Sequence, residues 1–271
     1  MSQAADPAVK VVPAAPGSKA RILAITSGKG GVGKTFVAAN LAAALVRQGK
    51  RVLVLDADLG LANLDVVLNL APKVTLHDVF TGKTALDNAI LPAPGGFSVL
   101  LAGSGLVEYS RLTGEVREQL LGIVEALTPR FDCILLDTGA GISDVVLFAV
   151  SLANEVLVVA TPEPTSMTDA YATIKVLATQ QQRRDIWLVV NQVGRAGEGR
   201  TVRAQLQKVV DQYVTPLMED TTPPIKLDLL GEIPVDPAVR EAVQKRRLLL
   251  ELVPGCPAAQ AIGALAAKLL A

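Results

Sequence analysis

The chain has 271 residues, of which 50% are hydrophobic and 19% are charged, a composition too apolar for a disordered protein. The 26 Lys and Arg residues balance 26 Asp and Glu residues, which excludes a bulk positive field that would draw the whole molecule to nucleic acid or anionic lipid. The length allows one large α/β domain or two small ones.

Residues 1–19 are rich in Ala and Pro and lack the continuous apolar core of a secretory signal. We expect a flexible N-terminal tail there, followed by one domain at residues 20–271. Gly, Pro or charged residues interrupt every hydrophobic run before it reaches the roughly 18 residues that a membrane span needs. The two cysteines, Cys133 and Cys256, are too few for a disulfide framework or a four-ligand zinc site. Together these features predict a cytoplasmic protein.

From residue 21 onward, short and nearly unbroken apolar runs alternate with longer helical patterns. This alternation is typical of parallel strands that crossover helices cover on both faces. The expected strands are 22–26, 52–55, 97–101, 133–136, 155–159, 186–190 and 227–233. A Pro- and Gly-rich stretch at 92–96 indicates an antiparallel insertion, and 257–270 is the expected last helix. The predicted fold class is α/β: a single doubly wound domain with a mostly parallel sheet of about seven or eight strands.

A glycine-rich segment follows the first expected strand, where residues 28–35 read Gly-Lys-Gly-Gly-Val-Gly-Lys-Thr. Two glycines separated by four residues and followed by Lys and Thr satisfy the phosphate-loop pattern. Backbone N–H groups and a helix N-terminus converge there on a point suited to polyphosphate. We expect Lys34 to reach the β- and γ-phosphates and the Thr35 hydroxyl to bind Mg²⁺. The predicted nucleotide-binding residues of this segment are Gly28, Lys29, Gly30, Gly31, Val32, Gly33, Lys34, Thr35 and Phe36.

Two further expected strands end in carboxylates, Asp56 with Asp58 after the second and Asp137 after the fourth. The carboxyl ends of parallel strands share one edge of the sheet, so these acids should face the bound phosphates. Mg²⁺ prefers oxygen ligands, which carboxylates supply directly or through water. Each acid taken alone could be a helix cap. Three of them beside a phosphate loop predict a metal–nucleotide site.

These motifs resemble the MinD/ParA branch of P-loop ATPases, in which the phosphate loop carries an extra lysine near its start; Lys29 is that lysine here. The resemblance extends over nearly all of residues 21–270 and is strongest to the flagellar-number regulators FlhG, FleN and YlxH. The stretches that suggest this branch are 56–65, 137–143 and 161–171.

The resemblance implies an ATP-dependent homodimer that hydrolyses ATP slowly with Mg²⁺ as cofactor. Lys29 of each subunit is expected to reach the partner's phosphates, where its charge offsets the repulsion between two facing polyphosphates. Asp58 matches the residue that orients the attacking water, and Asp56 and Asp137 match the groups around Mg²⁺. Lys29, Lys34 and Asp58 are the candidate catalytic residues. Hydrolysis is expected to open the dimer.

Further site residues are implied by the same resemblance. Asn191 matches a base-contacting Asn, and the segment around Pro234 and Asp236 matches one that covers the base. The candidate switch or dimer residues are Asn63, Gly139, Gly141, Glu163 and Asp169. For Glu163 and Asp169 an alternative remains, because acids near a helix N-terminus interact favourably with its dipole.

The function that this branch implies is a positional switch that controls the placement or number of a cellular structure, with polar flagella as the structure that the resemblance favours. The partners it implies are a flagellar GTPase or another machine component, with recruitment to a cell pole or to the inner membrane surface. Residues 1–19 show no convincing copy of the activating motif for a GTPase. Lys268 is the only charge in 258–271, so the cationic face that membrane-docking helices use is absent, and membrane recruitment is expected to be weak, indirect or absent.

Three alternatives remain open. The first is a ParA-like, nucleoid-binding ATPase that partitions DNA or cargo and binds DNA through basic residues of its last third, such as the run Lys245-Arg246-Arg247; a charge run of this kind is usually a solvated face. The second is a metabolic P-loop ligase, for which Lys29 has no evident use. The third is electron transfer through a cluster bridging two subunits, but Cys133 lies in a predicted buried strand and Cys256 lies near the C-terminus.

Overall fold

The computed structural model describes residues 20–60, 62–103, 112–218 and 223–271. The predicted tail at residues 1–19 lies outside the described residues. No helix in the described ranges is long and apolar enough to cross a membrane.

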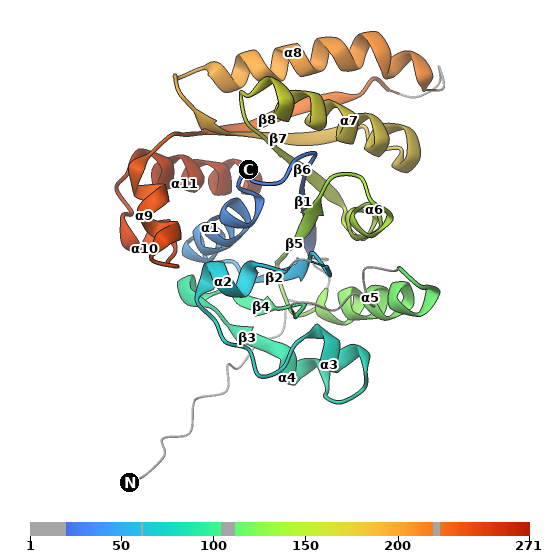
Figure 1. The fold of residues 1–271 in the computed structure, drawn as a ribbon, viewed down its shortest axis with the longest axis vertical. Helices are drawn as coiled ribbons and strands as arrows, with labels where there is room; N and C mark the ends of the chain where they lie inside the picture. Colours follow the sequence, from blue (N-terminus) through green and yellow to red (C-terminus); the bar gives the residue numbers. More distant parts are fainter. Residues whose placement is uncertain (1–19, 61, 104–111, 219–222) are drawn as a thin grey trace.

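An eight-stranded sheet forms the centre of the molecule, in the order β3-β4-β2-β5-β1-β6-β7-β8 (Figure 1). Its strands are β1 (Arg21–Ser27), β2 (Val52–Ala57), β3 (Ile90–Pro92), β4 (Ser98–Leu100), β5 (Cys133–Ala140), β6 (Glu155–Ala160), β7 (Asp185–Val193) and β8 (Lys226–Pro234). Every neighbouring pair is parallel except β3 and β4. The predicted doubly wound α/β domain is therefore confirmed.

Each of the seven predicted apolar runs forms a strand, because a parallel strand covered on both faces needs apolar side chains in both directions. The eighth strand, β3, is the predicted antiparallel insertion. It is joined to β4 through a 3₁₀ turn, η1 (Pro94–Gly96), in which Gly95 and Gly96 have φ angles of 81° and 84°. Glycine adopts this left-handed conformation at little cost, which lets the chain reverse there.

Helices cover both faces of the sheet (Figure 1), and two clusters of buried apolar side chains lie between the helices and the sheet. One face carries α1 (Lys34–Arg47), α2 (Leu64–Leu68), α9 (Pro237–Gln244), α10 (Leu249–Leu252) and α11 (Pro257–Leu270). The other carries α3 (Leu76–Phe80), α4 (Leu86–Ala89), α5 (Gly114–Leu127), α6 (Asp144–Ser151), α7 (Pro164–Gln181) and α8 (Glu198–Tyr213).

The last helix, α11, packs into the domain as expected. Its buried side chains are Ala258, Ala259, Ile262, Leu265, Ala266 and Leu269. The Lys268 ammonium donates a hydrogen bond to the Leu229 carbonyl at 2.5 Å. The only charged side chain of this helix is therefore used to attach it to β8.

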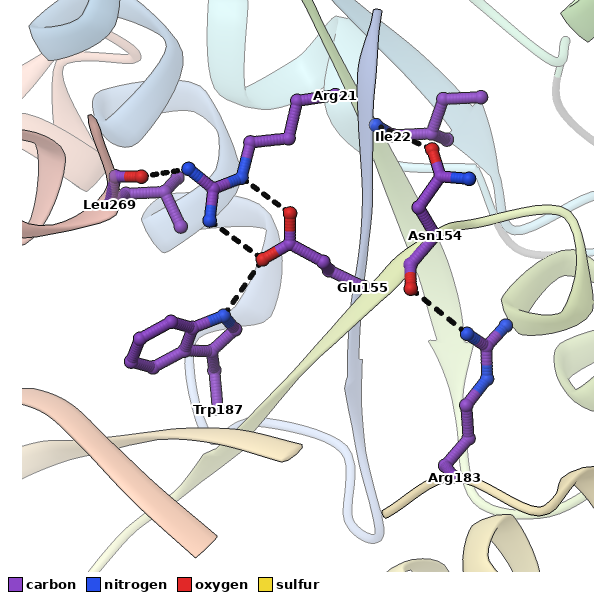
Figure 2. A network of polar contacts seen from close by, with 7 residues as sticks. All are labelled: Arg21, Ile22, Asn154, Glu155, Arg183, Trp187 and Leu269. Carbon is purple, nitrogen blue, oxygen red and sulfur yellow. Dashed lines mark hydrogen bonds and ion pairs between the residues drawn. The ribbon is translucent and has the colours of Figure 1, made fainter. Parts of the chain in front are cut away.

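A polar network closes the edge of the sheet where the parallel strands begin (Figure 2). The Arg21 guanidinium binds both carboxylate oxygens of Glu155, at 2.5 and 2.7 Å, and also donates to the Leu269 carbonyl of α11. Trp187 Nε1 donates to Glu155 at 2.9 Å. Burial raises the pKa of Glu155, but the hydrogen bonds from Arg21 and Trp187 outweigh it and hold that pKa below its ordinary value.

Candidate functional site

A cavity of about 1000 Å³ opens at the other edge of the sheet, where β1, β2 and β5 end. The phosphate loop, the loop after β5 and the first turns of α1 and α6 contribute to its lining. The predicted residues that it brings together are Gly30, Gly31, Gly33, Lys34, Thr35, Phe36, Asp56, Asp58, Asn63, Asp137 and Gly139. The carboxyl ends of parallel strands lie at the same edge of the sheet, so segments that are distant in the sequence meet there.

The glycines of the phosphate loop serve different physical needs. Gly31 and Gly33 have φ angles of 83° and 97°, a left-handed conformation that side chains disfavour. Around Gly30 and Gly31 a Cβ atom would meet nothing, so the space beside these two residues is open. At Gly28 a Cβ would overlap the backbone carbonyl of Asp169. Gly28 therefore lets α7 pack directly against the loop.

Lys29 points to α7 of its own chain. Its ammonium lies 3.3 Å from the Glu163 carboxylate and 3.1 Å from the Thr165 hydroxyl. The Lys29 and Glu163 side chains are 41% and 64% exposed, and an exposed pair of this kind stabilises a protein by only about 0–1 kcal/mol. The structure thus joins two predicted site residues, in a contact that costs little to break. Thr165 was missed by the sequence analysis, although it stands two positions after Glu163 in the same helix start.

Asp56 and Asp137 are directly paired neighbours on β2 and β5, and they are only 1% and 3% exposed. Burial, followed by the charge of Asp137, raises the pKa of Asp56 well above its ordinary value. Burial also raises the pKa of Asp137 to about 6, against the lowering effects of a hydrogen bond from Thr35 and the charge of Lys34. The half-buried Asp58 adds a third carboxylate, and its backbone N–H donates to Asp56 Oδ1 at 3.2 Å.

These groups fit a magnesium ion. Asp56 Oδ2 and Asp137 Oδ1 are buried and have no hydrogen-bond partner among the described residues. A buried acceptor without a donor is unfavourable, and a hard dication or its bound water would satisfy both oxygens. The Thr35 hydroxyl, which donates to Asp137, stands at the same place. Thr35, Asp56 and Asp137 could therefore hold Mg²⁺ directly or through water.

The loop after β5 lies against this carboxylate cluster. A Cβ at Gly139 would be 3.1 Å from Val146 Cγ2, a tight contact, and 3.4 Å from Asp58 Oδ1, an ordinary van der Waals contact, so this glycine lies close to the Asp58 carboxylate. Gly141 has a φ of 88°, and its N–H donates to the Ser27 carbonyl at 2.8 Å, which ties this loop to the start of the phosphate loop. Asn63 is exposed at the start of α2, on the rim of the cavity.

The predicted base-contacting residues do not line the cavity, and of them Asn191 lies beside the phosphate loop. Asn191 is buried at the end of β7, and its amide donates to the Val32 carbonyl at 2.8 Å. Pro234 ends β8. Asp236 accepts from the backbone N–H groups of Ala238 and Ala258 at 2.9 and 3.1 Å, so its carboxylate caps α9 and also binds the first turn of α11. Asp236 thus fastens two helices beside the segment that was predicted to cover the base.

Apolar residues of the cavity were missed by the sequence analysis. Val67 of α2, Leu112 and Val243 of α9 line it together with the predicted Phe36. Val243 is 54% exposed. A single valine on this short helix carries no sequence motif.

Comparison with known proteins shows which family this chain belongs to. The ParA family model, described as NUBPL iron-transfer P-loop NTPase, matches residues 18–270. The antiactivator FleN of Pseudomonas aeruginosa is 42% identical over 248 residues, which cover 92% of this chain and 85% of FleN. The flagellum site-determining protein YlxH of Helicobacter pylori is 32% identical over 251 residues, covering 92% of this chain and 82% of YlxH.

A solved structure agrees with these relatives. The septum site-determining protein MinD of Pyrococcus horikoshii, complexed with Mg-ADP, superposes with a TM-score of 0.75 at 28% identity, covering 92% of this chain and 96% of that one. The chain belongs to the ParA/MinD family of P-loop NTPases and is an ATPase.

Proposed function

We propose that this ATPase is a dimerising switch that controls the placement or number of a cellular structure, and that this structure is the polar flagellum. The similarity to FleN and YlxH, over 92% of this chain in each case, supports the flagellar role. The likeness to MinD supports the broader role in placing structures.

In this proposal the phosphate loop holds the triphosphate of ATP. Backbone N–H groups of the loop and of the first turn of α1 bind the phosphate oxygens, and Lys34 neutralises charge on the β- and γ-phosphates. Thr35, Asp56 and Asp137 hold Mg²⁺, which neutralises further phosphate charge when bound. Asp58 orients the attacking water at the γ-phosphate. Asn191 and the segment around Pro234 and Asp236 are proposed to receive the adenine.

The observation that carries the switch is the position of Lys29, which is part of the phosphate loop and whose ammonium, among the described residues, is held by an exposed contact with Glu163 and Thr165. When two copies face each other over their nucleotides, the triphosphates repel. Lys29 of one copy leaves Glu163 and binds the phosphates of the other, which offsets that repulsion. Dimerisation consequently depends on ATP.

The loop at Gly139 and Gly141 reports the γ-phosphate in this proposal. It lies close to Asp58 and is hydrogen-bonded to Ser27, so loss of the γ-phosphate would change its contacts at both ends. Hydrolysis then opens the dimer. Asn63, Glu163 and Asp169 lie at the proposed contact between copies.

Replacement of Lys29 by Ala tests the switch. Lys29→Ala should bind ATP nearly as well as the unmodified chain, because Lys34 and the loop remain, yet it should sediment as a monomer with ATP and Mg²⁺. Lys175→Ala, which removes an exposed cation from α7, is the matched control and should still dimerise. A normal ATP dimer of Lys29→Ala in analytical ultracentrifugation would reject the role of Lys29.

The partner is proposed to be a protein of the flagellar machine, such as its GTPase. Lys268, the only charged residue of α11, is bonded to Leu229, so this helix presents no cationic face to a membrane. A pull-down with Asp58→Ala and ATP, which should trap the dimer, would capture the partner. ATP-dependent, salt-sensitive DNA binding would instead favour a ParA-like role in partitioning.

A further inference from the structure

The amide of Asn191 is buried between the end of β7 and the phosphate loop. The residue is 6% exposed. Its Nδ2 donates to the Val32 carbonyl at 2.8 Å, and its Oδ1 accepts from the backbone N–H of Gln192 at 2.9 Å. Both polar atoms of the side chain are thus engaged with backbone, one of them across to the loop.

The backbone at the end of β7 is shaped to aim this amide. Gln192 has a φ of 59°, a left-handed conformation that is uncommon for a residue other than glycine. The pairing of β7 with β8 also shifts register between Asn191 and Val193. The hydrogen bond from Gln192 to Asn191 Oδ1 lies within this bend and fixes the amide plane, so that Nδ2 faces Val32.

The phosphate loop is packed onto the same amide. A Cβ at Gly33 would lie 2.5 Å from Asn191 Nδ2, so the loop backbone approaches the side chain as closely as glycine allows. Gly33 has a φ of 97° and stands directly before α1. The amide therefore holds two successive loop residues, Val32 through its carbonyl and Gly33 through contact.

We propose that Asn191 is a positioning residue for ATP binding, whose amide keeps the Val32–Gly33 segment in the shape that directs the loop N–H groups to the phosphates. A loop with four glycines in six residues has many alternative conformations, and restricting them before the ligand arrives avoids that ordering cost on binding. Without the amide the buried Val32 carbonyl would also lose its donor. The inference concerns the ATP site itself and does not depend on the cellular role proposed above.

A ligand that lacks the adenine base distinguishes two roles of Asn191, namely positioning the phosphate loop and contacting adenine. Calorimetry with Mg²⁺ would measure the affinity of Asn191→Ala for ATP and for inorganic tripolyphosphate. Both affinities should fall by the same factor, on the order of tenfold, because the loop itself is disturbed. Weaker ATP binding with unchanged tripolyphosphate binding would overturn the proposal in favour of a base contact, and unchanged binding of both would overturn it outright.

An isosteric variant separates the hydrogen bond from packing. Asn191→Asp keeps the side-chain volume but places a carboxylate against the Val32 carbonyl, so near pH 8 it should bind tripolyphosphate more weakly than Asn191→Ala. As the pH falls and the new carboxyl becomes protonated, it regains a donor, and its affinity should rise relative to that of Asn191→Ala at the same pH. A pH-independent ratio of the two variants would contradict the proposal.

The neighbouring residue supplies the control. Gln192→Asn introduces a side chain that tolerates the left-handed conformation, and its affinities should match those of the unmodified chain. Circular dichroism checks that each variant is folded. Hydrogen exchange without ligand should be faster at residues 30–34 in both Asn191 variants, and unchanged exchange there would also overturn the proposal.

Discussion

Asp56 and Asp137 are placed side by side with almost no access to water. Two neighbouring buried carboxylates repel each other, which disfavours the state in which both are charged. A bound dication would offset this repulsion, so these two residues are suited to binding Mg²⁺. Asp58, which is half-buried and lies against Gly139, is better suited to contacting a water molecule.

Removal of the Asp58 carboxylate should separate binding from hydrolysis. We expect Asp58→Ala to bind ATP and dimerise, because Lys34 and Lys29 remain. The hydrolysis rate should fall by about 10²- to 10⁴-fold, the usual contribution of a positioned acid or base. A phosphate-release assay measures it. Asp87→Ala, which removes an exposed carboxylate from α4, controls for the loss of charge, and turnover of Asp58→Ala at the unmodified rate would exclude Asp58 from the mechanism.

Sequence motifs identified the candidate residues that lie near their own strand ends. Lys34, Thr35 and the strand-end carboxylates follow from local pattern plus the rule that parallel strands share an edge. The contact of Lys29 with Glu163 could not be predicted, since the two are 134 positions apart and exposed ion pairs leave no periodic signal. The same holds for Asn191 and Val32, whose separation is 159 positions.

The strands also differ in how well the sequence predicted them. Apolar runs predicted seven strands because burial on both faces demands continuous hydrophobicity. The short β3 has only three residues and a proline, too few to give a pattern, and was indicated only by the turn residues beside it. Strand ends were extended by one to several residues wherever polar side chains continue the pairing, as at Asp137 and Asn191.

Among the strands and helices, the contacts of Glu155 at the start of β6 lead to a testable prediction about stability. Its lowered pKa means that the ion pair stabilises the fold above the unfolded-state pKa of about 4.3 and loses this effect as the pH falls through the folded-state pKa. At pH 7 we expect Glu155→Gln to reduce the free energy of unfolding by about 1–2 kcal/mol, since Arg21 and Trp187 lose a charged acceptor.

The difference from the unmodified chain should then shrink between pH 5 and pH 3. Urea unfolding, followed by circular dichroism and by the fluorescence of the single tryptophan, measures it at each pH. A difference that stays constant with pH would show that Glu155 acts through packing. Asp185→Asn, which changes an exposed carboxylate at the start of β7, is the control.

At the scale of the whole molecule, ligand binding and folding are linked. A ligand that binds only the folded chain stabilises it by about 2.7 kcal/mol at 100 times its Kd, which corresponds to a Tm increase of about 5–8 °C for a domain of this size. Lys34→Ala should show no such increase with Mg-ATP, whereas Lys83→Ala, on an exposed turn, should show all of it. Differential scanning calorimetry measures both, and a full Tm shift in Lys34→Ala would show that ATP is held without this lysine.

The bond from Arg21 to the Leu269 carbonyl joins the beginning of the first strand to the last turn of the final helix. The described backbone is therefore almost a closed ring. A short peptide linking residues 20 and 271, with the chain reopened at the exposed turn of Gly82 and Lys83, would produce a circular permutant in which neither the new linker nor the new ends cut the segments that line the nucleotide pocket.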